Sequence, residues 1–512
     1  MSHPPLRRRA VLLGAAAVAA AGALPLPARA AAYPVINLKT DCGAKGDGVG
    51  NDTGALQRAV EKITAAGGGT LDIPAGVYKI GGQNQGRVAG QPYYRYWTML
   101  EFKNLAFLHI RGSAGAVLRL AAGLHYGSFN PDDGTAQAPP AGEDYNELYR
   151  ARVGAMIQVE DSSDVTIENL ELDGRNGTLV LGGRWGDTGI QATATGMRLL
   201  RNTNVTISDV HTHHHGLDGL TIGYGGLTTA DPPKPHTVTG VRSEYNGRQG
   251  LSWTGGNSLT VTDSQFNHTG RGAVRSAPTS GLDIEAESSV CRNGLFTRCE
   301  FVDNGGPGVI ATNGDGGYTR FEGCTFWGTT TWSAYTNKPG LVFKWSNFYG
   351  RNNLGYGGAD AALATKYADC LFEDRPWTNG QVYRDGYLVT DEASADSGQN
   401  VQFADCRFVA RQVRSVWTNT DTKVKTFLRC TFDHRYAGVA EGGIQSHPWG
   451  ARFVACAFTE STGTTTSRWY VHLNGVVVDP SPDGTPTTVA GPTVRWGSPT
   501  GAVGVIPVGT YG

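Results

Sequence analysis

The chain has 512 residues, and its 44 lysine and arginine residues nearly balance its 45 aspartate and glutamate residues. This balance argues against nucleic acid as the partner, because such binding needs a strongly basic surface. Glycine accounts for 72 of the 512 residues, roughly twice its average usage, which is typical of many tight turns between short strands.

Residues 1–30 are predicted to form a signal peptide. Arg7–Arg9 precede the apolar run 10–26, and Ala28-Arg29-Ala30 resembles a cleavage site. Paired arginines before an alanine-rich run favour twin-arginine export over an ordinary Sec signal, and the run is short for a membrane span. Removing the four arginines of this segment leaves 40 basic against 45 acidic residues, a formal charge of −5. We expect a secreted, extracellular monomer that makes no membrane contact after cleavage.

A capping helix is predicted directly after this segment. Asn51-Asp52-Thr53 is a suitable helix N-cap, and Gly67-Gly68-Gly69 ends the helix. Between them, apolar residues at helical spacing form one stripe, made of Leu56, Ala59, Val60 and Ile63. An amphipathic helix here would cover the open edge of a stack of strands.

Beyond about residue 160 the chain repeats a short unit of strand, Asn/Asp/Gly-rich turn and second strand. Examples are 165–170, 205–210 and 259–264. A period of 20 to 50 residues predicts a β-solenoid with loops of variable length. The expected fold is all-β, a single-stranded parallel β-helix over residues 31–460 with an N-terminal capping α-helix, and residues 461–512 add C-terminal strands or a cap.

A second repeat is the motif Cys-x-Phe. It begins at Cys299, Cys324, Cys370, Cys406, Cys430 and Cys456. Since residues i and i+2 of a strand share a face, the motif predicts interior ladders of thiols and aromatic rings. A disulfide framework is the alternative in an exported protein with eight cysteines. Metal binding by these cysteines is less favoured, because there is no CxxC pair.

The segment 41–78 carries the motifs Gly-Ala-Lys-Gly-Asp-Gly, Asn-Asp-Thr and Ile-Pro-Ala-Gly-Val-Tyr. It resembles the N-terminal signature of the pectate-lyase superfamily, and more narrowly the group that holds family 28 glycoside hydrolases and related lyases and epimerases. The resemblance, which covers about residues 33–460, implies a right-handed parallel β-helix with an open carbohydrate groove. The Asn-Thr-Asp, Asp-Asp, Gly-His-Gly and Arg-Ile-Lys elements of family 28 are not found intact.

An acidic patch is the candidate active site. A Gly-aliphatic step repeated at residues 219, 250, 281 and 308 aligns four coils. In this alignment Leu282 and Ile284 point inward, so Asp283 and Glu285 point outward, ~6.5–7 Å apart. Asp218 lies two coils away, ~10 Å by the strand spacing. We predict Asp218, Asp283 and Glu285 as catalytic residues, although single outward acids on a solenoid are often only solvated.

Substrate-binding residues are predicted around these acids. They are His214, His215, Arg248, His268, Arg271, Arg275 and, in an aromatic segment that could equally be a packed loop, Trp97. No metal ligand is assigned and no cofactor is required. Calcium could bind the carboxylates of residues 283, 285 and 287. Zinc on the histidine run 211–215 would need a further ligand that the sequence does not show.

Two chemistries fit the patch, and both act on a polysaccharide. Acid/base hydrolysis needs two carboxyl groups, one to protonate the glycosidic oxygen and one to activate water. A polysaccharide lyase needs an anionic sugar whose carboxylate is neutralised by Arg248 or calcium before β-elimination. We favour a glycoside hydrolase, because the acidic residues are present in the sequence, whereas the group that would neutralise a uronate carboxylate is only inferred. A non-catalytic carbohydrate-binding β-helix is the third reading.

Overall fold

The computed structural model describes residues 33–186, 191–377, 386–391, 398–418, 423–435 and 447–460, and strands at 477–479, 487–490, 494–497, 503–506 and 509–511. One compact unit begins at Pro34. The predicted signal peptide lies outside the described residues. No helix among the described residues is long and apolar enough to cross a membrane.

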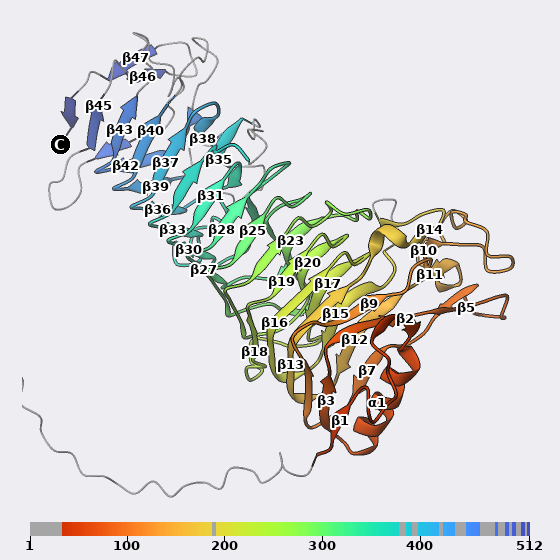
Figure 1. The fold of residues 1–512 in the computed structure, drawn as a ribbon. Helices are drawn as coiled ribbons and strands as arrows, with labels where there is room; N and C mark the ends of the chain where they lie inside the picture. Colours follow the sequence, from red (N-terminus) through yellow and green to blue (C-terminus); the bar gives the residue numbers. More distant parts are fainter. Residues whose placement is uncertain are drawn as a thin grey trace, which may run out of the picture. The chain divides into compact units, whose positions relative to one another are not determined.

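Successive coils pair in parallel and build three sheets, which confirms the predicted parallel β-helix (Figure 1). Each full coil passes through a first, a second and a third sheet. The first and second sheets are continuous through the long strands β13 and β16, and together they form a 29-stranded set.

The first sheet contains β1 (Val35–Asn37), β3 (Gly69–Ile73), β8 (Leu108–Gly112), β13 (Ser163–Asp173), β16 (Thr203–His213), β18 (His236–Thr239), β21 (Leu259–Thr262), β24 (Gly294–Thr297), β27 (Arg320–Glu322), β30 (Val342–Lys344), β33 (Lys366–Ala368), β36 (Gln402–Ala404), β39 (Lys425–Leu428), β42 (Ala451–Val454) and β44 (Val477–Asp479). The second sheet contains β2 (Asp47–Asn51), β4 (Gly76–Ile80), β9 (Ala116–Leu120), the second halves of β13 and β16, β19 (Arg242–Glu244), β22 (Gln265–Asn267), β25 (Glu300–Val302), β28 (Thr325–Trp327), β31 (Asn347–Tyr349), β34 (Leu371–Glu373), β37 (Arg407–Ala410), β40 (Thr431–His434), β43 (Ala457–Glu460), β45 (Thr487–Ala490) and the antiparallel β48 (Gly509–Tyr511).

The third sheet has twelve strands, β7 (Leu100–Lys103), β12 (Gly154–Glu160), β15 (Ala194–Leu200), β17 (Asp218–Gly223), β20 (Gln249–Trp253), β23 (Ser280–Val290), β26 (Val309–Asp315), β29 (Ala334–Thr336), β32 (Asn352–Asn353), β35 (Tyr387–Thr390), β38 (Arg414–Thr418) and β41 (His447–Pro448). The remaining strands lie outside these sheets and are β5 (Gln83–Gln85), β6 (Tyr94–Tyr96), β10 (His125–Ser128), β11 (Arg150–Ala151), β14 (Val180–Leu181), β46 (Val494–Gly497) and β47 (Val503–Ile506).

A sharp corner separates the first sheet from the second in each coil. One residue per corner adopts a left-handed conformation, with φ between 50° and 56° at Asn169, Asp209, Asp263, Arg298, Trp345, Asp369, Asp405, Arg429 and Ala455. Aspartate and asparagine tolerate this conformation best among non-glycine residues. The strand, Asn/Asp turn and second strand predicted from the sequence therefore form one corner of a coil.

The core contains two stacked aromatic ladders, of which the first-sheet ladder includes Phe296, Phe321 and Phe343. In the second sheet, rings of adjacent coils stack with centroids 4.7 to 5.6 Å apart, through Phe266, Phe301, Phe326, Phe348, Phe372, Phe408, Phe432 and Phe458. All eight cysteines lie in the described part of the chain, are buried and form no disulfide there. The thiol and ring ladders are confirmed, and the disulfide alternative is wrong, since all eight thiols are free.

The helix α1 (Thr53–Ala65) packs against β1, β3 and β7 at the N-terminal end of the stack (Figure 1). Leu56, Ala59 and Ile63 are buried, as the stripe predicts. Asp52 is the N-cap residue, as the sequence predicts, but its carboxylate makes no hydrogen bond to the first turn of the helix. It instead accepts hydrogen bonds from the backbone N–H groups of Lys45 and Gly46, at 2.7 and 3.0 Å.

Candidate active site

The third sheet brings part of the predicted patch together on β17, β20 and β23. Asp218 is in register with Gln249, and Ser252 with Asp283. The predicted inward residues are buried, namely Leu220, Ile222, Leu251, Trp253, Leu282 and Ile284. Their alternates therefore belong to the outer face of this sheet.

Asp218 and Arg248 form a buried, bidentate ion pair. The Arg248 Nε and Nη2 atoms donate to the two Asp218 carboxylate oxygens at 2.8 and 2.6 Å. The Asp218 side chain is 1% exposed and that of Arg248 17%. Burial opposes the charge on Arg248, but Asp218 and the neighbouring acids raise its pKa overall. Losing either partner of such a pair costs ~3–5 kcal/mol, since the other charge stays buried.

Asp283 lies on the neighbouring strand β23 and is buried, with 4% of its surface exposed. Burial, followed by the nearby charge of Glu285, raises the pKa of Asp283 to about 8. The Gln249 Nε2 atom donates to Asp283 Oδ2 at 2.6 Å. Gln249 Oε1 is buried and has no hydrogen-bond partner among the described residues. Burial and the neighbouring acid thus both favour the neutral form of the Asp283 carboxyl group.

Glu285 follows two residues later on β23 and is less buried than Asp283. Burial raises the pKa of Glu285, while Arg248 opposes the rise. The register between β23 and β26 shifts between Asp283 and Glu285. Such a bulge changes the direction of a side chain and is common beside active sites.

A row of mainly polar residues crosses the outer face of the third sheet. Strand register aligns Glu101, Gln158, Arg198, Thr221, Ser252 and Asp283 on six neighbouring strands. Near its N-terminal end lies a cavity of about 180 Å³, whose lining includes Tyr96, Glu101, Arg152, Gln158 and Arg198. Because one residue per coil contributes, the row runs along the helix axis.

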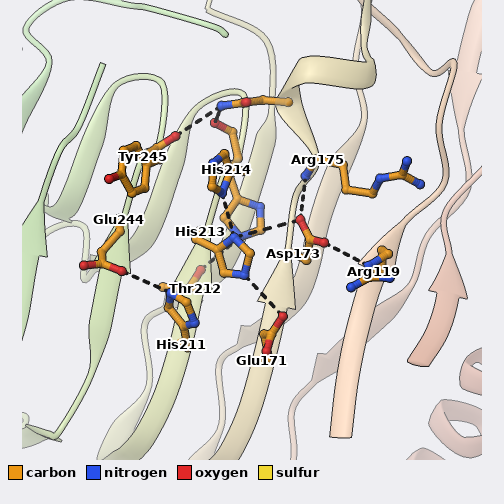
Figure 2. Close-up of polar contacts among 12 residues, drawn as sticks. Arg119, Glu171, Asp173, Arg175, His211, Thr212, His213, His214, Glu244 and Tyr245 are labelled. Atoms are coloured by element: carbon orange, nitrogen blue, oxygen red, sulfur yellow. Dashed lines mark hydrogen bonds and ion pairs between the residues drawn. The ribbon is translucent and has the colours of Figure 1, made fainter. Parts of the chain in front are cut away.

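The other predicted residues lie elsewhere. His214 and His268 occupy left-handed positions after second-sheet strands, and both rings stack on Tyr245 (His214 in Figure 2). Arg271 is ion-paired with Asp303 at 3.1 Å.

His215 is buried in the coil interior, where its Nε2 lies 2.9 Å from Thr212 Oγ1. Trp97 is 37% exposed and its Nε1 donates to Asn84 Oδ1 at 3.0 Å. Arg275 is exposed. The patch predicted as one site is thus divided between two faces and the interior, because residues adjacent in sequence turn corners of the coil.

Sequence reasoning missed Gln249, Arg152 and Arg198. Arg198 alternates with the buried Met197 and Leu199, so strand periodicity could have placed it outward. Gln249 directly precedes Gly250 of the aligned coils, and its contact with Asp283 depends on the coil-to-coil register.

A separate cluster of side chains has the spacing of metal ligands. Among the described residues, three His, Cys, Asp or Glu side chains have ligand atoms within 4.8 Å of one another only at Glu171, His211 and His213. The set expected for calcium, residues 283, 285 and 287, does not reach this spacing.

Fold and site together define a right-handed parallel β-helix protein with buried carboxyl groups on its third sheet. A family model described as a right-handed beta helix region matches residues 145–331. This match and the observed topology agree with the fold that the superfamily resemblance implies.

Among curated relatives, mannuronan C5-epimerase AlgE4 of Azotobacter vinelandii is 28% identical over 204 residues, which is 36% of this chain and 31% of that protein. Alginate lyase 7 of the same organism is 47% identical over 45 residues, 9% of this chain and 5% of that protein. These matches span less than a third of the relatives' length. The solved A-module of AlgE4 aligns with 90% of this chain and 100% of its own, at 17% identity and a TM-score of 0.41.

Proposed function

We propose that this chain is a secreted carbohydrate-active enzyme that hydrolyses the glycosidic bonds of a polysaccharide at the third-sheet site. One observation carries the proposal: Asp283, a carboxyl group with only 4% of its surface exposed, lies two residues from Glu285 on one strand, and this setting raises its pKa to about 8. A carboxylic acid that keeps its proton at neutral pH is the group a glycosidase needs as its general acid.

The proposed roles follow from position. Asp283 donates its proton to the glycosidic oxygen as the bond to the anomeric carbon breaks. Glu285, nearer the solvent, removes a proton from the attacking water. Two residues on one strand lie ~6.5–7 Å apart, within the roughly 6.5–9.5 Å that an inverting mechanism requires. Asp218 fixes Arg248 beside both acids.

Substrate binding is assigned to the polar row on the third sheet. Arg152 and Arg198 line the cavity at its N-terminal end, where they can bind sugar hydroxyls or carboxylates. Arg198 precedes Asp283 by three strand steps, ~14 Å at the usual strand spacing. A bound chain would therefore contact the cavity and the acids at the same time.

A uronate-specific lyase or epimerase is the second candidate. The observation that favours it is the likeness to mannuronan C5-epimerases and to an alginate lyase. In this mechanism Arg248, a neutral Asp283 or calcium neutralises the uronate carboxylate, so that a base can remove the C5 proton. The product is an inverted sugar or an unsaturated chain end.

The test incubates the purified chain with neutral and uronate polysaccharides, with and without a calcium chelator. Reducing ends, the ultraviolet absorbance of unsaturated ends and proton NMR of the polymer are followed together. New reducing ends without absorbance support hydrolysis. Rising absorbance or C5 inversion without new ends overturns it in favour of the second candidate. No change in any signal, together with retained binding, supports the non-catalytic reading.

A further inference from the structure

A cluster of histidines and acids lies on the outer face of the second sheet, away from the third-sheet site. The strand β16 contributes His211 and His213, which alternate with the buried Thr212 and so share the outward direction. Register sets Glu171 of β13 opposite His211, and Glu244 of β19 opposite His213. Figure 2 shows these side chains converging.

The donor atoms of three residues meet at close range. His213 Nε2 lies 3.4 Å from Glu171 Oε1, and the rings of His211 and His213 have centroids 4.3 Å apart. All three residues can place a ligand atom within 4.8 Å of the others. Donors bound to a tetrahedral zinc ion at ~2.0–2.1 Å lie about 3.3 Å from one another, so little movement is required.

From this geometry we propose that Glu171, His211 and His213 bind a divalent transition-metal ion of the zinc class. Imidazole nitrogens suit zinc, copper, nickel and iron, whereas calcium and magnesium prefer oxygen ligands alone. Two histidines and one glutamate are also a known zinc ligand set that leaves a coordination position for water or substrate. The proposal does not depend on the third-sheet site.

Surrounding groups orient these ligands, as outer partners of metal sites do. His213 Nδ1 lies 2.7 Å from His214 Nδ1 and 3.9 Å from Asp173 Oδ1. Asp173 is itself held by Arg119 Nε at 2.9 Å and by the backbone N–H of Arg175.

On the other side, Glu244 Oε2 lies 3.2 Å from His211 Nε2. Arg242 holds that carboxylate at 2.8 Å. Both histidines are thus held in place by neighbours whose positions are themselves fixed.

The site remains open to solvent. The exposed fractions of the side chains are 38% for Glu171, 30% for His211 and 13% for His213. An ion can therefore enter from water, and a remaining coordination position would face outward.

The experiment uses the untagged full chain, stripped with a chelator and dialysed. Zinc binding is measured by calorimetry, and cobalt(II) is added as a spectroscopic probe of tetrahedral coordination. Variants His213→Ala and Glu171→Gln remove one ligand each, and the second keeps the side-chain shape. The matched control is His109→Ala, because His109 makes a similar surface pair with Glu168, at 2.8 Å, without a second histidine.

We expect one zinc ion per chain, visible cobalt absorption, and affinity weakened about tenfold or more by either ligand variant, with no change for the control. Binding that is absent from the wild-type chain, or equal in all four proteins, overturns the proposal and leaves the cluster as histidine–glutamate ion pairs. Circular dichroism of each variant, compared with wild type, shows whether a loss reflects unfolding, and Glu171→Gln decides the matter if His213→Ala unfolds.

Discussion

Asp283 and Glu285 differ from the many surface acids of a solenoid because their environment disfavours their charge. Asp283 is buried and has Gln249 as its hydrogen-bond partner. Only a neutral carboxyl can donate a proton, so the proposed mechanism ties activity to the ionisation of this residue.

The first prediction concerns the pH dependence of turnover. Since the pKa of Asp283 is about 8, kcat/KM should fall as pH rises through this value and the acid loses its proton. A pH profile of kcat/KM on the preferred substrate measures it. A profile that stays flat to pH 10 would contradict the role of Asp283 as acid.

The second prediction concerns stability. The pKa of Asp283 is about 8 in the folded chain and ~3.9 when unfolded. Between these values the folded state binds more protons, so its contribution to the free energy of unfolding falls as pH rises, by at most about 1.4 kcal/mol per pH unit. Urea unfolding should show Asp283→Asn gaining stability relative to wild type from pH 5 to pH 8. A constant difference would be inconsistent with the raised pKa.

The third prediction is that the contribution of His215 to stability has the opposite pH dependence. Burial lowers its pKa to about 3, below the unfolded value of ~6.5. The unfolded state therefore binds the extra proton, and the stability from a neutral His215 is lost as pH falls from about 6.5 towards 3. Unfolding curves should be less acid-sensitive in His215→Asn, and equal acid sensitivity in both proteins would argue against this prediction.

At the scale of elements, the ladders of the second sheet explain why the Cys-x-Phe spacing is irregular. The interval of 46 residues between Cys324 and Cys370 contains a further coil, in which Ser346 and Phe348 occupy the motif positions. Ser346 Oγ donates to Lys344 O at 2.8 Å, and Cys370 Sγ makes the equivalent contact with Ala368 O at 3.3 Å. Serine is therefore accommodated at this position.

The fourth prediction compares two changes in one coil. Phe372→Ala removes a ring that stacks on Phe348 and Phe408, and should lower the free energy of unfolding by ~3–5 kcal/mol. Cys370→Ser should cost less than the loss of the ring, because the new hydroxyl can bond as that of Ser346 does. Denaturant unfolding measures both, and equal losses would show that the thiol ladder has a separate role.

For the whole molecule, the parallel β-helix fold could be predicted from the sequence. Periodicity indicated the strands, Asn169, Asp209 and Asp263 marked corners, and the Gly-aliphatic steps gave the third-sheet register that the structure confirms. These features are local, or repeat from coil to coil.

The candidate site could be predicted only in part, because it depends on which face each corner presents. His215 and Asp218 are three residues apart, yet one side chain lies in the coil interior and the other is paired with Arg248. Glu171 and His211 are 40 residues apart and adjacent in register. Contacts between neighbouring coils, such as that of Glu171 with His211, depend on the length of a complete coil, and this length varies with the loops.

We propose Asp283 as the general acid of a polysaccharide-cleaving enzyme. The decisive experiment compares the turnover of wild type, Asp283→Asn and Glu287→Gln on the best substrate of the panel. Glu287 is the matched control, since it lies on the same strand and is exposed. We predict that Asp283→Asn lowers kcat by about 10²-fold or more with unchanged circular dichroism, while Glu287→Gln keeps wild-type turnover. Near-wild-type activity of a folded Asp283→Asn protein would contradict the claim and place the chemistry elsewhere.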